Sequence, residues 1–173
     1  IELFLTEEQD AVTLYQWLCE RPFVQQRGKI KTYHPVVKDQ MLRYQLKRSP
    51  KIWEKEHYQL AKYFEERANN LGLTDIDEQY KNENWRNFQI EATFHKLCAN
   101  FDKELPEAVR KLVFTLEKTR NNENAITWSD IILKAGELND ENDWSKFISK
   151  GISAWLAEKN EDALIFFERL NKD

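Results

Sequence analysis

Apolar side chains along most of this chain recur every three to four positions, the pattern of helices with one buried face. The clearest case follows Ser49-Pro50, where Ser49 is expected to cap a helix and Pro50 to occupy its first turn. Asn69-Asn70 and Gly72 are expected to end this helix. Its apolar face is predicted to carry Trp53, His57, Leu60, Ala61, Tyr63, Phe64 and Ala68.

The same spacing predicts further helices, joined by short turns, through the rest of the chain. Asp75 or Asp77 is expected to cap a helix running as far as Cys98, and Pro106 to open the next one. A polar break at 121–124 precedes helices near 125–138, 143–157 and 160–170. From residue 49 onward we therefore expect an antiparallel helical solenoid or bundle.

The first 48 residues show a different pattern. A short strand at 2–5 and a helix capped by Thr6 are expected before Pro22, which cannot continue a helix. Segments 23–26 and 30–33 then predict a β-hairpin that turns at Gly28, and His34-Pro35 opens another helix. We interpret residues 1–48 as a partial winged helix. The predicted fold class is all-α with a small β-hairpin.

The last thirty residues predict one tetratricopeptide-like repeat, over 143–173. Gly151 takes the position of the small residue in the first helix, and Phe147 the position usually held by Trp. Ala163 and Phe167 take the small and aromatic positions of the second helix. A small residue lets two antiparallel helices approach, and the aromatic ring fills the space beside it. Earlier helices do not match the 34-residue consensus.

Charge separates the two regions. Nine Lys and Arg lie between Arg21 and Lys51 with one acid, Asp39, although the whole chain has a net charge of −4. Two distant cysteines, Cys19 and Cys98, favour a reducing, cytoplasmic setting. No apolar run approaches the roughly 18–20 residues that a membrane-spanning helix needs. Because the chain begins at Ile1, we read it as a piece of a longer protein.

The run Tyr33-His34-Pro35-Val36-Val37-Lys38-Asp39-Gln40-Met41-Leu42-Arg43-Tyr44 resembles the winged-helix end of the signal-transduction NTPases with numerous domains (STAND proteins, NB-ARC/AP-ATPase-like). The positions Trp53, His57, Leu60-Ala61 and Tyr63-Phe64 resemble the first sensor helix of bacterial members. Trp85, Ala92 to His95 and Leu97 resemble the next. In this family a nucleotide-binding domain and a winged helix precede a helical repeat sensor.

The resemblance implies that the chain is the non-catalytic linker and sensor region of a signalling ATPase. His34 would be the nucleotide-sensing residue, a contact to the β-phosphate of ADP in the full-length protein. The chain carries no G-x-x-x-x-G-K-[ST] loop, so we expect no enzymatic activity and no cofactor in this piece, with ATP or ADP bound only by the full-length protein. Its partners would be the upstream NTPase domain or another protein.

An alternative interpretation is a nucleic-acid-binding winged helix with a helical dimerisation tail. Its phosphate contacts could come from Arg27, Lys29, Lys31, Lys38, Arg43, Lys47 and Arg48. The acids Glu7, Glu8, Asp10 and Glu20 on the helix before the hairpin argue against DNA. His57 and His95 lie on apolar helix faces and are expected to be packed histidines, with no metal site, because His-x3-His and Cys-x2-Cys pairs are lacking.

Overall fold

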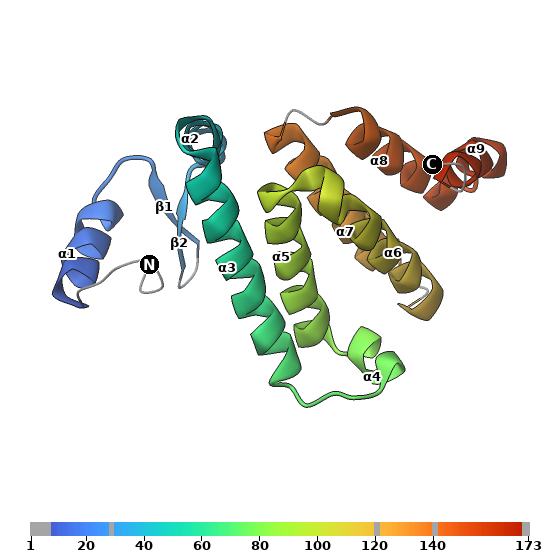
Figure 1. Ribbon diagram of the computed structural model, residues 1–173, viewed down its shortest axis with the longest axis horizontal. Helices are drawn as coiled ribbons and strands as arrows, with labels where there is room; N and C mark the ends of the chain where they lie inside the picture. The colour runs from blue at the N-terminus through green and yellow to red at the C-terminus, as the bar shows by residue number, and fades with distance from the viewer. Residues whose placement is uncertain (1–7, 28–29, 120–121, 140–141, 171–173) are drawn as a thin grey trace. The chain divides into compact units, whose positions relative to one another are not determined.

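The computed structural model describes residues 8–27, 30–119, 122–139 and 142–170. It is 83% helical with one two-stranded antiparallel sheet, which agrees with an all-α class plus a hairpin. Contacts divide the chain into two compact units, residues 1–48 (the hairpin unit) and residues 49–173 (the helical unit). Figure 1 shows the elements of each.

The hairpin unit contains α1 (Glu8–Cys19), β1 (Val24–Arg27), β2 (Ile30–Tyr33) and α2 (Pro35–Arg48). The strands pair from Val24 opposite Tyr33 to Arg27 opposite Ile30, so β1 starts one residue later than predicted. Helix α1 ends before Pro22, as the sequence indicates. The predicted strand at 2–5, the Thr6 cap and Gly28 itself lie outside the described residues.

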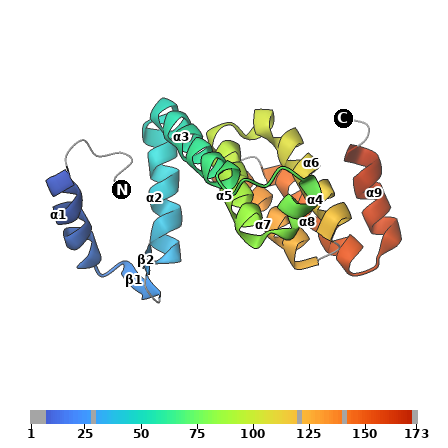
Figure 2. The same ribbon diagram turned by 90° about the horizontal axis from the view of Figure 1, so that it is seen from below.

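The helical unit opens with α3 (Pro50–Asn69), α4 (Ile76–Lys81) and α5 (Glu83–Ala99). In Figures 1 and 2, α3 and α5 lie side by side. Pro50 is in the first turn as predicted, but the Ser49 side chain makes no capping hydrogen bond. Gly72 follows α3 with a φ of 69°, a conformation that glycine adopts without strain.

The segment after Gly72 corrects one prediction, because it forms two helices instead of one. Asp75 caps α4 by accepting a hydrogen bond from the Glu78 amide at 2.9 Å. Asn82 then caps α5 in the same way, accepting from the Trp85 amide at 3.0 Å. The extended backbone of Asn82, with a ψ of 117°, separates the helices. A second capping side chain thus restarts the helix where the apolar spacing alone looked continuous.

The remaining helices are α6 (Phe101–Thr119), α7 (Asn122–Leu138), α8 (Asn142–Leu156) and α9 (Asn160–Leu170). Pro106 does not open α6 but lies inside it, which is a second correction. The helix starts five residues earlier because the Asn100 side chain accepts a hydrogen bond from the Lys103 amide. Fully buried side chains include Leu97, Leu112, Trp128, Ile132 and Ile148, so the core extends from α5 to α8.

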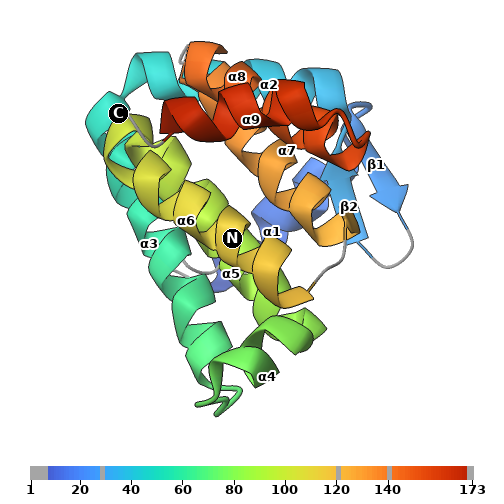
Figure 3. The same ribbon diagram turned by 90° about the vertical axis from the view of Figure 1, so that its right-hand side faces the viewer.

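The α8–α9 pair packs through the predicted small residue. Gly151 faces Phe166, and a Cβ at Gly151 would lie 2.6 Å from the Phe166 Cβ, closer than van der Waals contact permits. Ala163 and Phe166 are buried, and the Phe147 ring lies 5.4 Å from the Phe166 ring. A ring beside Gly151 is that of Phe166, and the predicted Phe167 side chain lies outside the described residues. Figure 3 shows these two helices together.

Candidate functional site

The predicted basic residues of the hairpin unit are mostly exposed. Lys31 on β2 and Lys38, Lys47 and Arg48 on α2 have exposed side chains. Arg43 is half-buried and makes contacts of its own, so it is not a free cation. The Arg27 side chain and Lys29 lie outside the described residues. The β2–α2 segment thus presents positive charge to its surroundings.

His34 lies at the junction of the hairpin and α2. Its backbone N–H donates to the Phe23 carbonyl at 2.7 Å, and its carbonyl accepts from the Lys38 amide at 2.9 Å. These two bonds extend the hairpin and start the helix. The imidazole itself is exposed. The fold therefore uses only the backbone of His34, which leaves the side chain accessible to a ligand.

Apolar side chains of the hairpin unit are also exposed. Tyr44 and Val36 of α2 are 62% and 64% exposed, and Trp17 of α1 is 49% exposed. No side chain described for residues 12–48 is buried, and the internal contacts of the unit include the stack of Phe23 on Tyr33 at 6.1 Å. A unit that buries so little cannot supply much hydrophobic stabilisation by itself. Mixed apolar and cationic surface of this kind suits contact with another protein surface.

The helical unit brings together two histidines that the sequence placed on separate helices. The Nδ1 atoms of His57 on α3 and His95 on α5 lie 2.9 Å apart, so one ring donates and the other accepts. Trp53 packs 3.9 Å from His57, and Phe64 stacks on His95 at 5.7 Å. Burial, with a smaller contribution from His95, lowers the pKa of His57 to about 3. The sequence predicts that each histidine packs on an apolar helix face, but it does not predict that the two rings contact each other.

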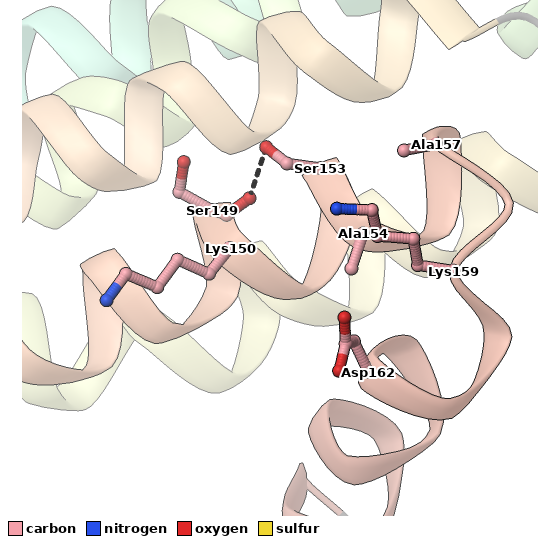
Figure 4. A pocket seen from close by; sticks show the side chains of 7 residues that line it. All are labelled: Ser149, Lys150, Ser153, Ala154, Ala157, Lys159 and Asp162. Carbon is pink, nitrogen blue, oxygen red and sulfur yellow. Dashed lines mark hydrogen bonds between the residues drawn. The ribbon is translucent and has the colours of Figure 1, made fainter.

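A shallow cavity of about 280 Å³ lies where α8 meets α9. Figure 4 shows its lining, which includes Ser149, Lys150, Ser153, Lys159 and Asp162. The Ser153 hydroxyl donates to the Ser149 carbonyl at 2.8 Å, so it is already used within α8. Both lysines are exposed. The cavity offers positive charge without a buried polar group directed into it, and it carries no functional assignment.

Metal chemistry was also considered. Among the described residues, no group of three or more His, Cys, Asp and Glu side chains could hold a metal ion. His57 and His95 form a pair without a third ligand of these kinds in that part of the chain.

Comparison of the chain with protein-family models, curated proteins and solved structures gave no match. Within the described ranges, every helix is too short or too polar to cross a membrane.

Proposed function

We propose that this chain is the linker and sensor region of a multidomain signalling ATPase of the STAND type. The hairpin unit would be the winged helix that docks on a nucleotide-binding domain, and the helical unit a tetratricopeptide-like region that binds a protein or other ligand. The observation that carries the proposal is the hairpin unit itself: its described side chains are all at least partly exposed, with apolar and cationic groups interspersed.

Three features of α2 support docking on a protein domain. Docking would remove the side chains of Val36 and Tyr44 from water, which contributes about 25 cal/mol of binding free energy per Å² of apolar surface buried. Lys38, Lys47 and Arg48 would steer an acidic surface towards the same helix. His34, whose imidazole takes no part in the described hydrogen bonds of the fold, is placed where α2 begins and could reach a phosphate held by the docked domain.

The test uses the full-length protein and its bound nucleotide. His34→Ala should leave the thermal unfolding of the isolated chain unchanged, because the fold uses only the backbone of this residue. In the full-length protein the same change should weaken ADP binding and raise basal ATPase activity. Tyr44→Asp should act in the same direction by disrupting docking, while Lys51→Ala serves as an exposed control outside the hairpin unit. Unchanged ADP retention in both variants would refute the proposal.

The second candidate is a nucleic-acid-binding winged helix with a helical dimerisation tail. The exposed cations of β2 and α2 favour it. Phosphate contacts alone would give binding that weakens steeply as salt rises, with little dependence on sequence. A gel-shift series across salt concentrations separates the two functions, since the linker proposal predicts no nanomolar DNA or RNA binding at physiological salt.

A further inference from the structure

Lys111 of α6 occupies an unusual position for a lysine. Its Nζ lies 2.9 Å from the Gln89 Oε1 atom and 3.1 Å from the Thr93 Oγ1 atom, both on α5. Thr93 is 2% exposed, and Lys111 itself is half-buried. The amine is thus held between two helices by neutral oxygen atoms. Lysines that leave bulk water usually do so beside a carboxylate.

The nearby carboxylates are engaged elsewhere. Glu107, one turn earlier on α6, accepts two hydrogen bonds from Arg110, each 2.7 Å long. Glu65 of α3 pairs with Lys96 of α5 at 2.5 Å. Within the described residues no carboxylate lies at ion-pair distance from the Lys111 Nζ. Burial, and then the charge of Lys96, lower the pKa of Lys111, so the neutral amine is more abundant than on an ordinary lysine.

We propose that Lys111 is a carboxylation site, at which the side-chain amine combines reversibly with CO2 to form a carbamate. The Nζ lone pair attacks the carbon of CO2 and forms the N–C bond. One C=O bonding pair moves onto oxygen, and one N–H proton passes to water. The product is a carbamate with one negative charge, and no electron donor or acceptor is needed. This inference stands apart from the proposed function.

The surroundings favour CO2 over larger electrophiles. CO2 is small and uncharged, so it can reach an amine that is half-buried between α5 and α6. The carbamate retains an N–H that can still donate to the Gln89 Oε1 atom. Its new oxygens can accept from the Thr93 hydroxyl, and they carry charge opposite to that of Lys96. Lys96 and Arg110 repel the ammonium form and would attract the carbamate, whereas Glu107 and Glu65 would act in the opposite direction.

The experiment equilibrates the purified chain with ¹³C-labelled bicarbonate and CO2 at about pH 8, followed by carbon NMR. Carbamates are then trapped with a trialkyloxonium salt and located by peptide mass spectrometry. Lys103 is the matched internal comparison: it is on the same helix, is exposed, and contacts Glu104 at 3.3 Å. We expect Lys111 to carry severalfold more trapped adduct than Lys103, because a larger share of its amine is neutral.

Three variants test whether the adduct forms at Lys111. Lys111→Arg should remove the carbamate signal of Lys111, and Lys103→Arg should retain it. Gln89→Leu should reduce adduct at Lys111 without removing the amine, because one of the two oxygens that hold Nζ is lost. The trapping experiment uses the unmodified chain, so it tests the carboxylation of Lys111 even if the Lys111→Arg variant does not fold. Adduct that is absent from Lys111, or no more abundant there than at Lys103, would overturn the proposal.

Discussion

Gly151→Ala tests the α8–α9 contact most directly, because two effects of opposite sign compete. Alanine is favoured over glycine inside a helix by about 1 kcal/mol. Against this, the added Cβ would lie 2.5 Å from the Phe166 Cδ2 and 2.6 Å from the Phe166 Cβ. A rotamer change could move Cδ2 with the ring, but Cβ is bonded to the backbone of α9 and cannot move away. Overpacking of this kind costs about 1–3 kcal/mol and more where the backbone must shift, so we expect net destabilisation.

A double-mutant cycle with Phe166→Ala isolates the contact. Phe166 is 2% exposed, so truncating it should cost about 3–5 kcal/mol. In that background the contacts with the ring atoms are gone and only the Cβ contact remains, so the cost of Gly151→Ala should fall. The difference between the two backgrounds measures the contact of Gly151 with the Phe166 ring. Non-additivity of this kind is expected only for residues in contact.

The assay is urea unfolding followed by circular dichroism, combined with amide hydrogen exchange of α8 and α9, because a terminal helix pair can unfold before the rest. Ser153→Ala on α8 and Leu164→Ala on α9 are the controls: both side chains are exposed, Leu164 by 56%. Each should change the free energy of unfolding by no more than about 0.5 kcal/mol. If Gly151→Ala stabilised the unmodified chain, the close packing of α8 on α9 would be refuted.

Three further outcomes are expected. The pKa of His57 is lowered to about 3 in the folded state, so the unfolded state binds the proton first as the pH falls below about 6.5. The free energy of unfolding should therefore drop by up to about 1.4 kcal/mol per pH unit. Urea titrations between pH 7 and 5.5 should show a slope that His57→Phe reduces. Asp75→Ala should cost about 0.5–2 kcal/mol by removing the α4 cap, read from thermal unfolding. Trp53→Phe should cost about 1–3 kcal/mol in urea unfolding, because the buried 2.7 Å hydrogen bond to the Cys98 carbonyl is lost; no loss would contradict that bond.

Helix positions were predictable where a local signal marks them. Pro50 begins α3 and Gly72 follows its end, in line with their backbone preferences. The prediction of one helix through Asn82 was wrong because an amide side chain can cap a new helix within a continuous apolar pattern. Pro106 was misplaced because the Asn100 side chain caps the helix earlier, which makes the proline the sixth residue of α6.

Contacts between helices were less predictable, since they depend on rotation and register. Adjacent residues on a helix differ by about 100° in direction, so the position of Phe166 beside Gly151 depends on how α9 sits on α8. The apolar faces of α3 and α5 indicated that His57 and His95 are packed. Their contact at 2.9 Å also depends on how α3 and α5 are aligned along their lengths. The apolar spacing within one helix does not give that alignment.

That register is set largely by polar contacts along α5. Towards α3, this helix receives the Trp53 indole N–H at its Cys98 carbonyl and pairs His95 with His57. Towards α6, it holds the Lys111 amine. Apolar faces tolerate small rotations, whereas a buried donor turned away from its acceptor costs about 1–3 kcal/mol. Rotating α5 by one residue would break these contacts together. Carboxylation of Lys111 would therefore change the charge beside α5, whose rotation is already fixed by its contacts with α3.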